Sequence, residues 1–399
     1  DGSGAIVPGA TVTVKNEKTG DTRTINVTAD GTFSVVALPP STYTITATGG
    51  SFEPARQEKI QLLVGQELKL SLLLQPKGVS AQVDVVSGEE IPLNISSASM
   101  SVNVTPREVA GLPVNGRQLS QLYLQAPGAV NSGTGTFGDI RFSGRAVQQN
   151  IIRYDGVEGS AIIDASPGNL NGEVPSPFRL QSSLENVQEF RVESNNFPAE
   201  YGTGTGGQIN VVTKSGSNQF HGSVFEYLRR DGLDARNFFD NVTAGVSKSK
   251  LQLDQFGGSI GGPIIKNKFF FFGSYEQYRG RFGLNFVEAA PSLSLAQAGA
   301  LIPGTSTPVN PAVQPFIAGF RSPAATVIPN ASATAGFDIV QLQANESTDE
   351  KAAAARFDYQ INQHNKLYFR FFRDQGKDVA PEGVSGRVVT IRAVPQNGV

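Results

Sequence analysis

The sequence predicts a mainly β protein in three parts: a small β-sandwich at residues 1–75, a mixed α/β domain at 96–218, and the first antiparallel strands of an incomplete transmembrane β-barrel at 219–399. Three observations predict this fold class. Charged residues make up only 17% of the chain, and that composition suits short strands joined by turns better than long helices. Apolar and polar residues alternate along the first and last parts. Long and short connections also alternate in the last part, as they do in outer-membrane barrels.

The composition excludes several kinds of site. The chain contains no cysteine, so it has no disulfides, thiolate metal sites or cysteine nucleophiles. A net charge of −2, without clusters of basic and aromatic residues, gives no indication of nucleic-acid binding. No run of eighteen apolar residues predicts a transmembrane helix, although a closed β-barrel crosses a membrane without one. The start, DGSGAIVPG, lacks an initiating Met and a signal peptide, so we expect a processed or truncated chain.

The first part has the alternation of a half-buried sheet. In ATVTVKNEKTG, Val12 and Val14 share one face, and the threonines between them share the other. Asp30 and Gly31 separate two strand patterns, TINVT and TFSVV, and this pair is a strong hairpin signal. The segments YTITATG and ELKLSLLLQ continue the alternation, the second with leucines on one face: Leu68, Leu70, Leu72 and Leu74. We expect a small β-sandwich.

The α/β part begins with two short helices. In TPREVAGL, Thr105 caps the helix, Pro106 suits its first position, and Glu108 completes a capping box. NGRQLSQLYLQAPG predicts a second helix that ends at Pro-Gly and packs an apolar stripe into the core: Leu119, Leu122 and Tyr123. Short strand patterns follow in DIRFSG, QNIIRYDGV, VQEFRVES and QINVVTK.

From residue 219 the strands resemble those of a lipid-facing barrel. KAAAARFDYQIN and KLYFRFF alternate between an apolar and a polar face, and KNKFFFFGSYEQY does so less regularly. The connections IIKNK and NQHN are short. The intervening connections, at 231–250 and 283–349, are long. Long outer loops and short periplasmic turns explain this alternation, whereas a soluble sandwich has no reason to show it.

A glycine-rich stretch, YGTGTGG, leads directly into the last strand pattern of the α/β part, QINVVTK. Its glycines are Gly202, Gly204, Gly206 and Gly207. A phosphate-binding loop would lead into a helix N-terminus, with a Lys or an acidic ribose partner nearby. This stretch leads into a strand. We therefore interpret the glycines as structural, allowing turns with positive φ and close approach to a neighbouring strand.

Residues 1–75 resemble the carboxypeptidase regulatory-like domain, through DGSGAIVPGATVTV, ADGTFSV and LPPSTYTITATG. The family name suggests a peptidase, but a zinc carboxypeptidase needs closely spaced His and Glu ligands. The two histidines of the chain, His221 and His364, do not begin an H-x-x-E motif. Neither His lies in a motif that would orient a nucleophile. We expect no enzyme, no metal and no cofactor.

The order of LPVNGRQLSQL, RFSGRAVQQNIIRYDGV and LENVQEFRVESNNFPAEYGTGTGGQINVVTK resembles the plug domain of TonB-dependent outer-membrane transporters. With the preceding sandwich and the hairpin GGPIIKNKFFFFGSYEQYRG, the resemblance is to the Oar-like group. It implies an outer-membrane protein with its sandwich in the periplasm. It also implies a TonB-type energy-transducing partner, contact with outer-membrane lipid, and uptake of a scarce ligand. The ligand class stays open between an iron chelate, an oligosaccharide and a peptide, and an adhesin or surface-assembly protein of the same architecture is the alternative function.

In such transporters TonB pairs with a short N-terminal strand by β-augmentation. The linker at 76–95 contains one strand-forming piece, which is the candidate TonB box: Gln82, Val83, Asp84, Val85 and Val86. The alternative is a plain linker strand that packs on the sandwich.

Four charged residues lie in RFSGR and NIIRYDGV: Arg141, Arg145, Arg153 and Asp155. They allow two interpretations. They could form a buried charge cluster where the plug meets the barrel wall and break apart on activation, or they could be ordinary solvated or structural ion pairs.

The length of the barrel part is short for closure. A barrel of about 22 strands, each of at least roughly 9 residues, needs about 200 residues before any loops. The sequence after the plug is shorter than this, and we count about five strands in it. We therefore expect the chain to be a fragment of a longer transporter.

Overall fold

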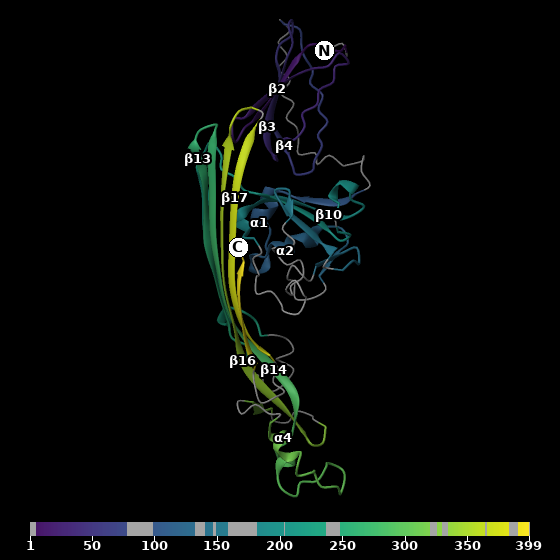
Figure 1. Cartoon of the computed structure of the whole chain (residues 1–399), viewed down its shortest axis with the longest axis vertical. Helices are drawn as coiled ribbons and strands as arrows, with labels where there is room; N and C mark the ends of the chain where they lie inside the picture. The colour runs from purple at the N-terminus through teal and green to yellow at the C-terminus, as the bar shows by residue number, and fades with distance from the viewer. Residues whose placement is uncertain are drawn as a thin grey trace. The chain divides into compact units, whose positions relative to one another are not determined.

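The computed structural model describes residues 5–77, 99–131, 140–146, 149–158, 182–202, 204–236, 248–319, 325–328, 334–363, 365–382 and 390–398. The chain forms two compact units. The first unit comprises Asp1–Val224, Gly258–Tyr275 and Ala352–Arg373. The second unit comprises Phe225–Gly257, Glu276–Lys351 and Asp374–Val399. Both units consist mainly of β-strands, as the sequence predicts (Figure 1).

The first unit begins with a four-stranded antiparallel sheet in the order β2-β1-β3-β4. Its strands are β1 (Thr11–Asn16), β2 (Thr22–Asn26), β3 (Ser41–Thr48) and β4 (Ala55–Leu62). Val12 and Val14 are buried in the core beneath this sheet, as the alternation predicts. Segments after β2 and after β4 supply the apolar side chains that cover the core from the other side.

Two strands expected in this sandwich do not form hydrogen-bonded ladders. The turn at Asp30-Gly31 is present, with the Thr28 N–H donating to Thr32 O at 2.9 Å, but the TFSVV arm after it is not a strand. The leucine segment at 67–75 is also not a strand, although Leu74 is buried and the alternate leucines before it pack on the core. Alternation reports side-chain burial, and burial does not require a continuous main-chain ladder.

The α/β domain is built on a five-stranded sheet in the order β5-β10-β11-β8-β9. Its strands are β5 (Met100–Val104), β8 (Ile151–Tyr154), β9 (Val157–Glu158), β10 (Val187–Asn195) and β11 (Gln208–Thr213). The β8–β11 pair is parallel, and the other pairs are antiparallel. A separate antiparallel pair is formed by β6 (Ala129–Asn131) and β7 (Ile140–Phe142).

Short helices cover one face of this sheet. They are α1 (Pro106–Gly111), η1 (Asn115–Arg117), α2 (Leu119–Leu122), η2 (Tyr123–Gln125) and η5 (Leu184–Asn186). A further short helix, η6 (Ala199–Tyr201), contributes no side chain to the core. The predicted capping box of α1 is confirmed, because Glu108 N–H donates to Thr105 Oγ1 and the Thr105 N–H donates to Glu108 Oε2 at 2.8 Å.

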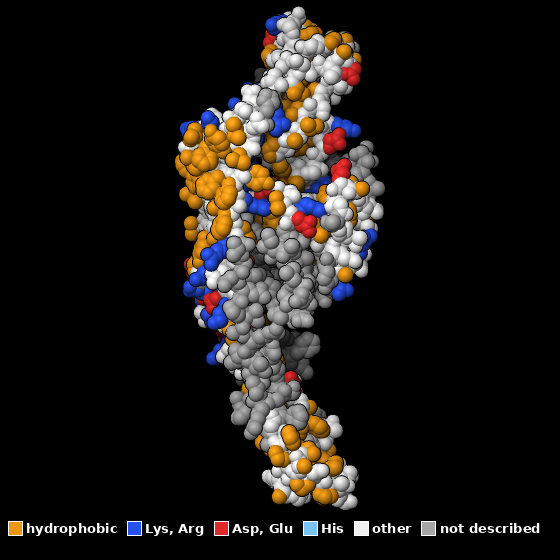
Figure 2. Space-filling view, in the orientation of Figure 1, with side chains coloured by type: hydrophobic (Ala, Val, Ile, Leu, Met, Phe, Trp, Pro, Cys, Tyr) orange, Lys and Arg blue, Asp and Glu red, His pale blue; other side chains and the backbone are white. Residues whose placement is uncertain are grey.

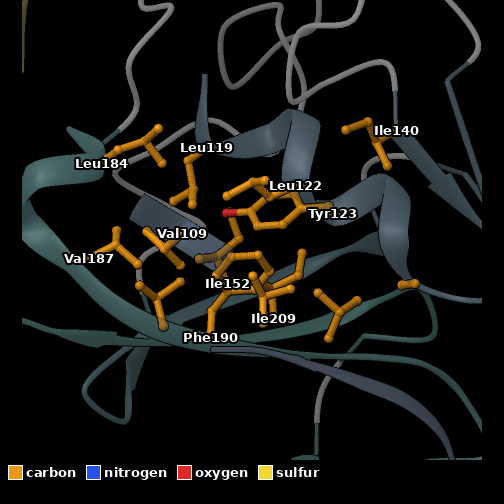
Figure 3. Close-up of a cluster of buried hydrophobic side chains, with 14 of the residues drawn as sticks. Val109, Leu119, Leu122, Tyr123, Ile140, Ile152, Leu184, Val187, Phe190 and Ile209 are labelled. Atoms are coloured by element: carbon orange, nitrogen blue, oxygen red, sulfur yellow. The ribbon is translucent and has the colours of Figure 1, made fainter. Parts of the chain in front are cut away.

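The core lies between the helices and the sheet. Figure 3 shows the predicted helical stripe of Leu119, Leu122 and Tyr123 facing Phe190 and Ile209 of the sheet. The Tyr123 and Phe190 rings meet edge to face with centroids 5.3 Å apart. All described members of this core come from the α/β domain itself. The domain therefore closes its apolar core without side chains from the barrel strands.

Long strands follow, in the order β12-β13-β14-β16-β17-β18, and the middle four lie side by side in Figure 1. They are β12 (His221–Arg230), β13 (Leu251–Ile265), β14 (Phe269–Pro291), β16 (Phe337–Gln360), β17 (Lys366–Glu382) and β18 (Thr390–Gly398). The connections from β13 to β14 and from β16 to β17 are short. The long connections contain η7 (Asp231–Leu233), η8 (Leu293–Ala296), α4 (Gln314–Gly319) and β15 (Thr326–Val327), which pairs with β16.

The expected long connection at 283–349 is wrong in its bounds, because β14 continues to Pro291 and β16 begins at Phe337. Polar side chains link the two strands there: Ser292 Oγ donates to Asp338 Oδ1 at 2.7 Å, and Gln343 Nε2 donates to Asn285 Oδ1 at 3.2 Å. The apolar alternation used for prediction ends earlier than the ladder, since a strand needs an apolar face only where it is covered by lipid.

Apolar side chains gather on the outward face of the barrel strands. Figure 2 shows a hydrophobic patch in the region of β13, where Ile260 and Ile264 are exposed. Leu367 and Phe369 of β17 are 62% and 60% exposed. At the short turns, the rings of Phe269 and Tyr359 stack edge to face with centroids 5.6 Å apart. Aromatic residues at strand ends are typical of the membrane interface in outer-membrane barrels. Among the described residues, no helix has the length and hydropathy to cross a membrane.

Candidate functional site

Asp155 occupies a tight turn between β8 and β9. Both turn residues have positive φ, 49° at Asp155 and 85° at Gly156, which is the pattern of a type I′ hairpin and suits an Asp-Gly pair. The Asp155 N–H donates to Val211 O of β11 at 2.8 Å. These constraints fix the position of the carboxylate at one end of the α/β sheet.

The Asp155 carboxylate is only 9% exposed and is surrounded by donors. The Thr213 N–H and hydroxyl donate to it at 2.9 and 2.6 Å. Arg356 Nη1 of β16 lies 3.2 Å from one carboxylate oxygen, and Arg370 Nη1 of β17 lies 2.9 Å from the other. A single carboxylate of the α/β domain therefore binds two arginines on adjacent barrel strands.

Further contacts fix both arginines. Arg356 Nε lies 2.9 Å from Asp358 Oδ2, and Arg356 Nη1 donates to Thr213 Oγ1 at 2.7 Å. The guanidinium of Arg356 lies over the Tyr368 ring, and that of Arg370 lies over the Tyr154 ring. Two arginines face two carboxylates, so the charges balance in a largely buried place. We call this group the Asp155 cluster: Asp155, Thr213, Arg356, Asp358 and Arg370.

A second group of polar contacts centres on Glu185 of η5. Its carboxylate lies 2.9 Å from Arg117 Nη2 and 3.6 Å from Lys214 Nζ, and it accepts hydrogen bonds from the hydroxyls of Ser223 on β12 and Ser259 on β13. Burial raises the pKa of Glu185, but the Ser223 hydrogen bond and the two cations outweigh it, so the pKa lies below its usual value. Glu185 therefore stays ionised at neutral pH.

The four charged residues singled out in the sequence are not brought together. Asp155 lies in the cluster above. Arg153 donates to Gln208 Oε1 and to Tyr201 O, each at 2.7 Å, inside the α/β domain. Arg145 donates to Thr205 O, and Arg141 is exposed on β7. These four side chains therefore do not form one cluster. The buried Asp155 carboxylate needs cations at its own position, and residues distant in sequence supply them.

Sequence reasoning missed Arg356 and Arg370 as the partners of Asp155. A signal was present, since both are the charged positions on the polar faces of KAAAARFDYQIN and KLYFRFF. Their neighbours Phe357 and Phe369 point outward and are exposed, so the arginines point inward. The pattern gives the face of each arginine but not its partner.

The glycine-rich stretch packs against the segment that leads into β8. The Gly206 N–H donates to Gln149 O at 3.0 Å, and the Gly207 N–H donates to Asn150 Oδ1 at 2.9 Å. A Cβ on Gly206 would lie 2.6 Å from Asn150 Oδ1 and 2.7 Å from the Gln149 carbonyl carbon. Gly202 and Gly204 have positive φ, and a Cβ on Gly207 would overlap the Phe142 ring.

The sheet face opposite the core carries buried ionisable groups. Glu189, Arg191 and Glu193 alternate along β10 with core residues and are 2%, 7% and 3% exposed. Arg191 Nε lies 2.8 Å from Glu193 Oε1. Glu189 Oε1 accepts the Val64 N–H at 2.6 Å, and burial, opposed by this hydrogen bond and by Lys18, raises the pKa of Glu189 to about 7.

The candidate TonB box, Gln82–Val86, lies outside the described residues. Among the residues that are described, no group of three or more His, Cys, Asp or Glu side chains could hold a metal ion.

Comparison with known proteins identifies two domains. Residues 1–75 match the carboxypeptidase regulatory-like domain, and residues 212–398 match the outer membrane beta barrel domain. The chain is 29% identical to the TonB-dependent transporter Oar of Myxococcus xanthus, over 63% of this chain and 23% of that protein. The expected resemblance to Oar-like TonB-dependent transporters is confirmed, and the chain is an outer-membrane protein that spans about a quarter of its relative's length.

Solved structures with a similar arrangement include a mutant of the ferric enterobactin receptor PfeA from Pseudomonas aeruginosa, at a TM-score of 0.45 and 15% identity, covering 74% of this chain and 35% of that one. Another is the outer membrane transporter YddB from Escherichia coli, at a TM-score of 0.42 and 13% identity, covering 72% and 34%.

Replacing Gly206 with Ala should destabilise the first unit by roughly 1–3 kcal/mol, because the added methyl overlaps the main chain of residues 149–150. Denaturant unfolding measures the effect. The matched control is Gly111→Ala at the end of α1, where a Cβ meets nothing within 4 Å and stability should change little. Equal stability of the Gly206 variant and the parent would contradict the close approach.

The variant Asp155→Asn should loosen the plug from the barrel wall. It leaves two buried arginines facing a neutral amide, and breaking a buried ion pair destabilises by roughly 3–5 kcal/mol. Limited proteolysis of the plug in isolated outer membranes should become several-fold faster. Asp234→Asn is the control, because its ion pair with Arg229 is half exposed and contributes little. Unchanged protease sensitivity of the Asp155 variant would refute this role.

Glu189→Gln tests the raised pKa. Protonated Glu189 binds its proton more tightly in the folded state, with a pKa of about 7, than in the unfolded state, near 4.5. Folded stability therefore falls as pH rises from about 4.5 to 7 and is constant above that range. Gln does not titrate, so the variant should match the parent at pH 4 and exceed it by roughly 1–3 kcal/mol at pH 8. Parallel pH profiles of the two proteins would exclude the shift.

Proposed function

We propose that this chain contributes the periplasmic sandwich, the plug and the first barrel strands of a TonB-dependent outer-membrane transporter that takes up a scarce ligand. The observation that carries the proposal is the Asp155 cluster, in which one plug carboxylate meets two arginines of the barrel wall. The similarity to a TonB-dependent transporter supports it.

The type of contact suits a plug that moves. All described members of the plug's apolar core belong to the plug itself, so this core does not have to open when the plug is displaced. Its described side-chain contacts to the barrel strands include the ion pairs and hydrogen bonds around Asp155 and Glu185. Water can replace such partners when the plug shifts and leave again when it returns. The plug is therefore held firmly at rest and can still be released.

The strand order indicates where force applied by a TonB-type partner would first act on the plug. The candidate TonB box at 82–86 precedes β5, which is the edge strand of the plug sheet. Among the described strands, β5 pairs with β10 alone, between Phe190–Val104 and Asn195–Met100. A TonB-type partner bound by β-augmentation to the segment before β5 would therefore load this ladder first. Peeling an edge strand disturbs one ladder and leaves the rest of the plug sheet paired.

The ligand is proposed only as a class: an iron chelate, an oligosaccharide or a peptide. We expect the groups that bind it on the plug apices and on the long connections, since binding residues concentrate on loops held by a rigid scaffold. The exposed apolar side chains of the barrel strands, such as Leu367 and Phe369, would contact outer-membrane lipid.

Proline substitutions in the full-length transporter test the function. Val83→Pro and Val85→Pro remove N–H donors that β-augmentation needs, so ligand uptake driven by the proton gradient should fall at least tenfold with normal amounts in the membrane. Ser96→Pro, just after this linker and outside the segment, is the matched control. Ligand that binds at the surface but never enters, with or without a proton gradient, would refute import and favour an adhesin.

A further inference from the structure

The sandwich contacts strand β10 of the plug. The turn at 63–66 presents the Val64 N–H to Glu189 Oε1 at 2.6 Å, and Arg191 Nη1 donates to Gly65 O at 3.3 Å. Gln188 Nε2 donates to Pro40 O at 3.3 Å. Gly65 has a φ of 65°, and a Cβ there would lie 3.0 Å from Arg191 Cδ, so the turn fits closely over this part of β10.

The same sandwich also touches the short turns of the barrel strands. Asp21 lies 2.6 Å from Lys366 Nζ at the start of β17 and accepts a hydrogen bond from Gln360 Nε2 at 3.2 Å. The Asn218 N–H, just before β12, donates to Lys18 O at 2.9 Å. Asn218 in turn exchanges two hydrogen bonds with Asn267 in the turn between β13 and β14, at 2.7 and 2.8 Å.

The loop that makes these barrel contacts is held in shape by the sandwich. Asn16 Oδ1 accepts the N–H groups of Lys18 and Thr19 at 2.9 and 3.2 Å, and Gly20 takes a φ of 75°. Asp21 is therefore presented by a preformed loop, and little conformational entropy is lost when it docks.

We propose that the sandwich is a clasp that joins plug strand β10 to the periplasmic turns of the barrel, so that the plug cannot leave the wall until the sandwich undocks. Two separate sets of contacts, one on the plug and one on the barrel turns, carry this inference. Its consequence for uptake rests on the proposed function.

The chain order gives the clasp a trigger. The sandwich ends at residue 77, β5 begins at Met100, and the candidate TonB box lies between them in sequence. Tension on this segment reaches the sandwich on one side and β5 on the other. β5 pairs with β10, the strand that the sandwich holds. Undocking and peeling would therefore act on the same strand.

Protonation of Glu189 favours the docked state, because burial in the contact disfavours its charged form. Lys18 of the sandwich faces it with opposite charge and acts in the other direction. On its own strand, Arg191 and Glu193 compensate each other at 2.8 Å. The clasp should therefore hold more firmly in acidic than in alkaline medium.

Engineered cysteines report docking directly, since the chain has none of its own. Pro40→Cys and Gln188→Cys, at partners joined by a hydrogen bond, should be linked in good yield by a short, cleavable bis-maleimide in outer membranes. Adding Asp21→Lys or Lys366→Asp should lower the yield at least fivefold. Combining both reversals restores the pair and should return the yield to within twofold of the starting protein.

Arg56→Glu is the matched control, because the Arg56–Glu58 pair is an exposed ion pair within β4 and takes no part in docking. The clasp is overturned if single reversals at Asp21 and Lys366 leave the yield unchanged, or if the double reversal does not restore it. Proteolysis of the plug should also be several-fold slower in the linked protein. If linking does not slow proteolysis, the proposal that the clasp restrains the plug is refuted.

Measurements of ligand uptake distinguish the clasp hypothesis from the proposed transport function. Uptake by the full-length transporter should stop when the cysteines are linked and resume when the linker is cleaved. If the protein imports nothing, the yields and the proteolysis still decide on the clasp. If linked protein imports at the normal rate, the clasp fails and the transport function stands.

Discussion

The buried carboxylate of Asp155 is the interaction on which the arrangement of plug and wall depends. A carboxylate that is 9% exposed is strongly destabilising unless cations and donors surround it. Here the donors come from three elements, Thr213 of β11, Arg356 of β16 and Arg370 of β17. The turn that presents it has positive φ at both central residues and cannot relax freely. Sliding either barrel strand past its neighbour would leave one arginine without its carboxylate. One ion cluster thus fixes the position of the plug and the relative register of two wall strands.

The division between apolar and polar surfaces follows from this constraint. Inside the plug, Tyr123 and Phe190 close a core that needs nothing from the barrel, so the domain keeps its fold wherever it lies. Outside it, the contacts to the wall are directional, and directional contacts give one docked position where a hydrophobic seam would tolerate several. Separating hydrogen-bonded or ion-paired groups also costs less free energy when water enters, because water offers them replacement partners. The same surface can therefore be specific at rest and separable under load.

Part of the local structure was predicted correctly from the sequence, whereas two strands of the sandwich and the long-range partners were not. Thr105 and Glu108 satisfy each other within one helical turn, and the glycines before β11 act on a neighbouring segment, so local pattern was sufficient. The partners of Asp155 lie about two hundred residues further along the chain, and alternation gives only the face on which each stands. The length of β14 and β16 was underestimated for a related reason. Main-chain hydrogen bonds and polar side chains join the outer parts of these strands. Such contacts leave no alternation of apolar and polar residues in the sequence.

The signs of the charges suggest an order of release. In each ion pair between the N-terminal domains and the barrel, the described carboxylate belongs to the sandwich or the plug and the cation to the barrel: Asp21 with Lys366, and Asp155 with Arg356 and Arg370. The Lys366 side chain is 36% exposed, whereas Arg356 and Arg370 are 15% and 20% exposed. Ions and water weaken exposed pairs more than buried ones. In the proposed mechanism the sandwich contact therefore yields first, while the Asp155 cluster still holds the plug. On that proposal the plug opens only under a load that persists after the sandwich has moved.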